Sequence, residues 1–134
     1  MGRRLILDTD ILVEIERGQW DPSLLDDEDV LAIAAVSLAE FRVGIELADT
    51  RQRADGRERH LAAALQAIEV LDYTENTAVA HGRLIAFVRR AGLTRGAHDL
   101  VIAAHAAETG RILMSRDAAA RFGDLPGVTA IQPG

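Results

Sequence analysis

Four carboxylates in this 134-residue chain stand where an apolar run has just ended or where a helical pattern begins. Two follow short apolar segments and two fall in the first turns of helical patterns; they are Asp8, Asp117, Glu40 and Asp99. A single acid at a helix start commonly caps the helix or interacts with its dipole, which stabilises it by about 0.3–1 kcal/mol. Taken one at a time, Glu40 and Asp117 fit that structural role best.

Together the four acids predict a cation site. Four carboxylates that converge on one end of a sheet repel one another unless a cation lies among them. Hard oxygen ligands suit Mg²⁺ or Mn²⁺. Metals held in this way polarise a phosphodiester, activate a water and stabilise the leaving oxygen. The net charge of −6 is unusual for a nucleic-acid partner, but a bound metal reverses the sign of the charge locally.

Composition limits the chemistry further. The length fits one domain over residues 1–134, and 49% hydrophobic residues suffice for a core. The absence of cysteine excludes disulfides and thiolate zinc sites, and all fifteen basic residues are arginine, which excludes a catalytic lysine. The apolar run Leu5–Leu7 is too short for a signal peptide or a membrane span, so we expect a cytoplasmic protein without membrane association.

Apolar periodicity predicts an α/β fold in which a parallel five-stranded sheet is sandwiched between helices. The predicted strands are Arg4–Leu7, Val30–Val36, Glu69–Leu71, Arg111–Met114 and Val128–Ile131. The predicted helices start near Ile11 and cover Leu38–Ala48, a long segment after Thr50, Glu75–Ala91, Ala97–Thr109 and Asp117–Phe122. Ligands of such sheets bind beyond the carboxyl ends of the strands, where Asp8 and Asp117 are expected.

Two polar residues are predicted to cap helices. Ser37 precedes the helix Leu38–Ala48 and Glu40 lies three residues later, the spacing of a capping box. Asp10 precedes the helix expected from Ile11, and aspartate is a favourable N-cap. Asp10 could instead support a metal bound at Asp8, and the sequence leaves both roles open.

The chain resembles the PIN domain and, within that family, the VapC toxins of bacterial VapBC toxin–antitoxin modules. Four segments carry the resemblance in the right order and at the right distances: LILDTDILVEI, VSLAEFRVGIELA, GAHDLVIAAHAAETG and LMSRDAAARFGDLPGV. The resemblance covers residues 1–134 as a single PIN domain. It implies an endoribonuclease toxin that depends on Mg²⁺ or Mn²⁺, and that a cognate VapB-type antitoxin inhibits.

The resemblance also implies roles for single residues. Asp8 and Asp99 are the principal metal ligands, and Glu40 and Asp117 complete the catalytic site. Ser115 matches a hydroxyl residue that supports the site from the end of a strand. The position of Asp10 is commonly Ser or Asn in the family, so this chain departs from the pattern by adding a fifth acid.

The implied reaction is in-line attack of a metal-activated water on RNA, which leaves a 5′-phosphate and a 3′-hydroxyl. Phosphates require cations, and guanidinium groups bind them bidentately. Arg95 and Arg116 are the candidate substrate contacts because each lies close in sequence to an acid of the site. Aromatic residues make up only 4% of the chain, which favours structured RNA such as tRNA or rRNA over an unfolded strand. His98 receives no role, and His105 is expected to be packed.

Two other functions remain open on the sequence. A haloacid-dehalogenase-like phosphatase also has a strand followed by Asp-x-Asp, as in LILDTDIL, but it uses a lysine that this chain lacks. A non-catalytic PIN-like interaction domain is the second alternative, and the four intact acids oppose it. The expected partners are the RNA substrate, the VapB-type antitoxin and a second copy of the chain in a homodimer.

Overall fold

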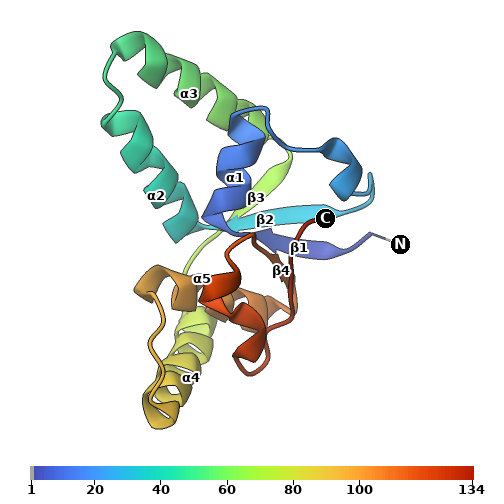
Figure 1. Cartoon of the computed structure of the whole chain (residues 1–134), viewed down its shortest axis with the longest axis vertical. Helices are drawn as coiled ribbons and strands as arrows, with labels where there is room; N and C mark the ends of the chain where they lie inside the picture. Colours follow the sequence, from blue (N-terminus) through green and yellow to red (C-terminus); the bar gives the residue numbers. More distant parts are fainter. Residues whose placement is uncertain (1) are drawn as a thin grey trace.

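Five parallel strands form the sheet in the computed structural model, which describes residues 2–134 (Figure 1). The strands are β1 (Arg4–Leu7), β2 (Val30–Ala34), β3 (Ile68–Leu71), β4 (Ile112–Met114) and β5 (Ala130–Ile131). They pair in the order β3-β2-β1-β4-β5, and every pairing is parallel. The predicted parallel five-stranded sheet is therefore confirmed, and β1 lies at its centre.

Helices cover both faces of this sheet, as predicted. They are α1 (Thr9–Glu16), α2 (Ala35–Glu46), α3 (Arg51–Ala64), α4 (Glu75–Ala91) and α5 (Ala97–Thr109). Figure 1 shows α1, α2 and α3 on one side of the strands and α4 and α5 on the other. Short 3₁₀ turns add Pro22–Leu24, Ala118–Ala120 and Phe122–Asp124.

The central strand divides its side chains between two cores. Leu5 and Leu7 pack in the cluster that contains buried residues of α1, α2 and α3. Ile6 packs in the other cluster, with residues of α4, α5 and the segment after β4. All three side chains have no solvent exposure. Because successive strand residues point to opposite faces, one continuous apolar run serves both layers.

The beginnings of α1 and α2 differ from the sequence predictions. Asp8, rather than Asp10, is the N-cap of α1, because the Asp8 carboxylate accepts a hydrogen bond from the backbone N–H of Thr9. Likewise α2 begins directly after β2 with Ala34 at its N-cap, so Ser37 lies inside the helix, fully buried. The predictions that Asp10 and Ser37 act as caps, and that Glu40 completes a capping box, are therefore wrong.

The bounds of α4 and α5 were predicted correctly to the residue. Both α4 and α5 end at a glycine with positive φ, Gly92 at 66° and Gly110 at 68°, a conformation that glycine adopts without strain. The helix predicted over Asp117–Phe122 is instead two 3₁₀ turns separated by Arg121. Within residues 2–134 no helix has the length and apolar character needed to cross a membrane.

Candidate active site

Asp8 directly follows the carboxyl end of β1, the central strand of the sheet, and is only 7% exposed. Its Oδ2 accepts a 2.7 Å hydrogen bond from the Ser115 hydroxyl, and its Oδ1 accepts one of 2.8 Å from the backbone N–H of Thr9. Burial raises the pKa of Asp8, and the negative charges of Glu40 and Asp117 raise it further. Asp8 is therefore held in one orientation in a site rich in negative charge.

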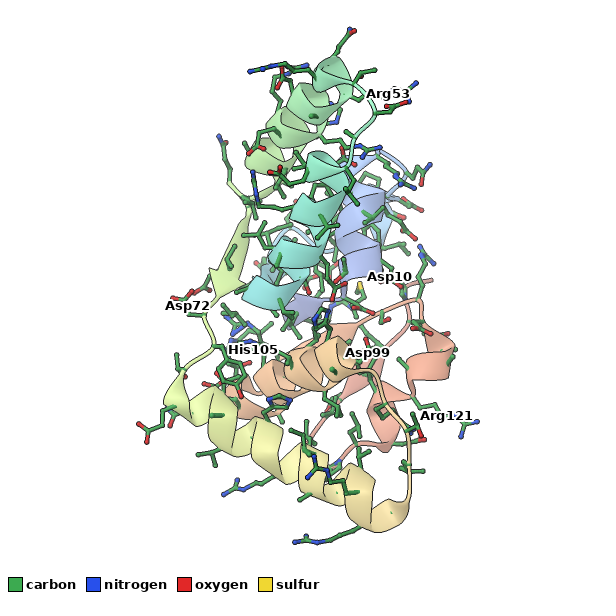
Figure 2. All side chains as sticks on the ribbon, turned by 90° about the vertical axis from the view of Figure 1, so that its left-hand side faces the viewer. Asp10, Arg53, Asp72, Asp99, His105 and Arg121 are labelled. Carbon is green, nitrogen blue, oxygen red and sulfur yellow. The ribbon has the colours of Figure 1, made fainter. Side chains whose placement is uncertain are left out.

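Asp99 lies in the first turn of α5, at the edge where the two helix layers meet (Figure 2). Among residues 2–134 no side chain or backbone group forms a hydrogen bond or ion pair with its carboxylate. Burial raises the pKa of Asp99, and the charges of Asp8, Asp117 and Glu40 raise it further. The charges of Glu40 and Asp117 thus act on both Asp8 and Asp99, and the charge of Asp8 also acts on Asp99.

The lack of a side chain at Gly96 leaves space for the Asp99 carboxylate. A β-carbon at residue 96 would lie 3.0 Å from Oδ2 of Asp99, closer than such contacts normally come. Gly96 is also the N-cap of α5 and provides no side-chain cap. The sequence Gly-Ala-His-Asp therefore leaves the first turn of this helix open around its acid.

Glu40 projects from α2 and contacts a residue that the sequence reasoning missed. The Nδ1–H of His98, in the first turn of α5, donates to Oε1 of Glu40 across 2.6 Å. His98 is 60% exposed, so its other ring nitrogen is open to solvent. The only sequence signal for His98 was its place beside Asp99, and no pattern in one chain pairs it with a residue 58 positions away.

Asp117 follows β4 and is tied to Asp8 through one hydroxyl. The backbone N–H of Asp117 donates to Oγ of Ser115 across 3.0 Å, and the same hydroxyl donates to Asp8. Oδ1 of Asp117 accepts from the backbone N–H of Ala120 at 3.2 Å, so this acid also caps a 3₁₀ turn. Ser115 therefore lies where the resemblance placed it, at the end of a strand and in contact with the acids.

Asp10 faces a neighbouring charged cluster. Its Oδ2 accepts a 3.1 Å hydrogen bond from the backbone N–H of Arg116, and the Arg116 guanidinium pairs with Glu14. Arg116 also lies 6.0 Å from the centroid of the Trp20 ring. Burial raises the pKa of Asp10, and the charge of Asp8 raises it further. The side chain of Arg116, a predicted substrate contact, is therefore already paired within the chain.

Arg95, the other predicted substrate contact, is largely buried. Its side chain is 9% exposed, donates to the carbonyl of Thr94 at 2.9 Å and lies 3.8 Å from a carboxylate oxygen of Asp124. A guanidinium in this position does not face solvent, so the structure gives no support to Arg95 as a phosphate contact. His105, which we expected to be packed, is 1% exposed, so that prediction is confirmed.

The donor chemistry at this edge fits a divalent cation. All four acids offer carboxylate oxygens, and the raised pKa values of Asp8 and Asp99 show that their ionised forms are costly without a nearby positive charge. Among residues 2–134 no three acidic or histidine side chains already lie at metal-binding spacing. Mg²⁺ keeps several of its waters and is held by only one or two carboxylates, so Asp8 and Asp99 would suffice as its protein ligands.

Comparisons with known proteins identify the family to which the chain is similar. The family model described as "PIN domain" matches residues 5–126. The plasmid stability protein StbB of Pseudomonas syringae pv. tomato is 31% identical over 122 residues, which cover 84% of this chain and 87% of StbB. Ribonuclease VapC2 of Rickettsia felis is 27% identical over 106 residues, which cover 75% of this chain and 77% of VapC2.

A solved structure is similar over the whole fold. It is VapBC2 from Rickettsia felis bound to a DNA fragment from their promoter, with a TM-score of 0.85 and 23% sequence identity. The similarity covers 98% of this chain and 99% of that chain. At this identity the likeness establishes the fold and leaves the activity to be argued from the site.

Proposed function

The chain belongs to the PIN domain family, and on that basis we propose that it is a divalent-metal-dependent endoribonuclease that cleaves structured RNA. The main support for the proposal is that four carboxylates near the carboxyl ends of the strands repel one another electrostatically. Asp8 and Asp99 both have a raised pKa, and each is affected by Glu40 and by Asp117. Perturbed carboxylates of this kind cluster at functional sites.

In this proposal Asp8 and Asp99 hold the cation, and Glu40 and Asp117 complete the site. When bound, Mg²⁺ or Mn²⁺ supplies Lewis-acid chemistry that polarises the phosphodiester and lowers the pKa of a water. Ser115 fixes the orientation of Asp8, because its hydroxyl donates to Oδ2 while the backbone of Thr9 holds Oδ1. His98 fixes Glu40 in the same manner from α5.

The reaction follows from these roles. Water attacks the phosphorus in line with the departing 3′ oxygen, so cleavage leaves a 5′-phosphate and a 3′-hydroxyl. The chain has no lysine to protonate the departing oxygen, which takes its proton from solvent. Every protein group assigned to the step is a carboxylate or a residue that orients one.

We extend the proposal to the biological setting, in which the chain is the toxin of a toxin–antitoxin module. One similar structure is a VapBC complex, and one curated relative is named for plasmid stability. The proposed partners are a VapB-type antitoxin and a second copy of this chain. Val43 of α2 and Leu47, the C-cap residue of that helix, support a protein partner, because they are apolar and 54% and 78% exposed.

Mapping of cleavage in cells tests the proposal. The wild-type chain and the Asp8→Asn variant are each induced briefly in a bacterium, and the new 5′-phosphate ends of cellular RNA are sequenced. We expect growth arrest and a small number of dominant cut sites with the wild type, and neither with the variant. If Asp8→Asn remains as toxic as the wild type, the nuclease assignment fails.

A further inference from the structure

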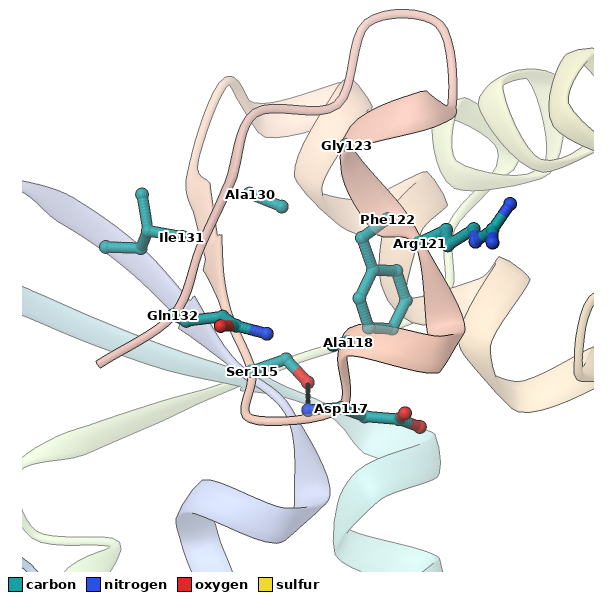
Figure 3. A pocket seen from close by; sticks show the side chains of 9 residues that line it. All are labelled: Ser115, Asp117, Ala118, Arg121, Phe122, Gly123, Ala130, Ile131 and Gln132. Carbon is teal, nitrogen blue, oxygen red and sulfur yellow. Dashed lines mark hydrogen bonds between the residues drawn. The ribbon is translucent and has the colours of Figure 1, made fainter. Parts of the chain in front are cut away.

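A cavity of about 200 Å³ opens directly beside the acidic site. Its lining includes Ser115 and Asp117, which belong to that site, and continues over the 3₁₀ turns to the end of β5 (Figure 3). The cavity is smaller than the roughly 300–1,000 Å³ of typical small-molecule sites. Its size suits one planar ring system rather than a whole nucleotide.

Away from Ser115 and Asp117, the walls of the cavity combine apolar side chains with the amide of Gln132. Figure 3 shows the Phe122 ring on one side and the Ala130 methyl group and Gln132 amide on the other. Phe122 is only 3% exposed, so its ring is fixed in place. The Gln132 amide offers one acceptor and two donors, and it has no hydrogen bond to any of residues 2–134.

We propose that this cavity is a subsite for one nucleobase of the RNA, next to the phosphodiester that lies at the four carboxylates. This inference rests on the proposed function, since it places the base beside Asp117. Bases in loops of structured RNA are unstacked and can enter such a pocket, where the buried Phe122 ring and the Ala130 methyl group form an apolar wall for the base. The exposed Gln132 amide offers an acceptor and two donors to the edge of the base, which favours bases with complementary groups.

The backbone beside the cavity supports this assignment. Arg121 has φ 48°, and it is the one non-glycine residue of the described chain with a positive φ. Non-glycine residues in this conformation carry strain and are concentrated at functional sites. Arg121 and Phe122 both border the cavity, and the guanidinium end of the exposed Arg121 extends away from it (Figure 3). Arg121 is thus placed to contact a phosphate outside the pocket that holds the base.

The binding of RNA oligomers that carry a single base tests the subsite without any cleavage. The probes are fluorescent RNA octamers with seven abasic nucleotides and one central A, C, G or U, and a fully abasic octamer is the reference. The Asp8→Asn variant is used so that the RNA remains intact, and affinity is measured by anisotropy. We expect at least one base to tighten binding fivefold or more over the abasic octamer.

Two variants in the same background identify the pocket. Ala130→Leu fills the cavity and is expected to abolish the gain from the base, whereas Gln132→Ala is expected to reduce the differences among the four bases. The matched controls are Ala62→Leu and Gln52→Ala, which change exposed residues of α3. Arg121→Gln is expected to weaken binding of all five octamers equally, and unchanged affinity would remove Arg121 from the site.

The outcomes separate this inference from the nuclease proposal. If no base tightens binding, or if both cavity variants keep the full gain, the subsite is overturned. Cleavage of a random RNA pool by the protein with Asp8 intact is then measured in Mn²⁺. Cleavage that lacks any base preference next to the cut also overturns the subsite while the nuclease proposal stands. An absence of cleavage contradicts the nuclease proposal, and the binding data alone decide the subsite.

Discussion

The Ser115 hydroxyl donates a 2.7 Å hydrogen bond to Oδ2 of Asp8, which joins the ends of the two neighbouring strands β4 and β1. Both residues are buried, at 3% and 7% exposure. The same oxygen of Ser115 accepts from the backbone of Asp117. One hydroxyl therefore determines the relative position of two of the four proposed catalytic acids.

Removal of that hydroxyl should weaken metal binding. Ser115→Ala frees Oδ2 of Asp8 and removes a hydrogen bond that favours its ionised form, the form that binds a cation. We expect Mn²⁺ affinity to fall roughly tenfold, a typical effect of residues that support metal ligands. Calorimetric titration with Mn²⁺ measures it, and the exposed Ser23→Ala is the control. Equal affinities in the wild type and the folded Ser115→Ala variant would contradict the role of Ser115.

His98 should affect turnover more than substrate binding. His98→Ala leaves Glu40 without the donor that orients it, so we expect kcat to fall roughly tenfold with little change in KM. His98→Asn keeps a donor and should recover part of the loss. His60→Ala is the matched control because His60 pairs with Glu16 on the surface, at 3.4 Å. An unaltered kcat in His98→Ala, or an equal loss in His60→Ala, would exclude the positioning role.

Neutralising one acid should stabilise the metal-free fold while it removes function. Asp99→Asn relieves repulsion from Asp8, Asp117 and Glu40, so we expect unfolding in EDTA to cost about 1 kcal/mol more. A cation at 100 times its Kd should stabilise the wild type by about 2.7 kcal/mol and the variant far less. Thermal unfolding with EDTA and with MnCl₂ measures both effects. The exposed Asp55→Asn should behave like the wild type both in EDTA and in MnCl₂. An Asp99→Asn variant that is less stable than the wild type in EDTA would contradict the repulsion among the acids.

The buried carboxylate of Asp29 should make the stability of the fold sensitive to acid. Asp29 accepts hydrogen bonds from Arg3, including 2.8 Å from its guanidinium, and its side chain is 1% exposed. The Arg3 guanidinium holds the pKa of Asp29 well below its usual range. A lowered folded pKa stabilises the protein above the unfolded pKa of about 4, and this stability is lost as pH falls below it.

Asp29→Asn should therefore lower the free energy of unfolding by about 1–3 kcal/mol at pH 7, because it removes charge-assisted hydrogen bonds. The difference from the wild type should shrink as pH falls from about 4 toward 2. Urea unfolding at pH 7, 5 and 3 measures it, with the exposed Asp27→Asn as the control. A difference that is the same at all three pH values would assign the loss to packing rather than to charge.

Much of the fold could be read from local patterns. The helices α4 and α5 were predicted with exact bounds because long periodic apolar faces end at glycines there. The starts of α1 and α2 were misplaced because Asp10 and Ser37 resemble caps, whereas each helix begins directly after its strand. At these two junctions the pairing of β1 with β2 in the sheet outweighs the preference of Asp10 and Ser37 for helix N-cap positions.

The sequence pattern singled out the four acids of the proposed site, but it could not predict their contacts. All four stand at strand ends or helix starts, and the rule that ligands bind at the carboxyl ends of parallel strands places Asp8 and Asp117 on the same side of the sheet. The His98–Glu40 hydrogen bond and the burial of Arg95 depend on how α5 packs against α2 and against the segment after β4. No periodicity within one segment carries that information.

Cleavage of RNA by the purified chain tests the proposed metal-dependent nuclease activity. The wild type, Asp8→Asn and Asp99→Asn are incubated with a structured RNA at rising Mn²⁺ and, separately, in EDTA, and the 5′ ends of the products are sequenced. We expect discrete cuts with 5′-phosphate ends by the wild type, no cuts in EDTA and loss of activity by at least a hundredfold in both variants, a loss of about 2.7 kcal/mol in transition-state stabilisation. Cleavage that persists in EDTA, or that either variant performs at the wild-type rate, would contradict the proposal.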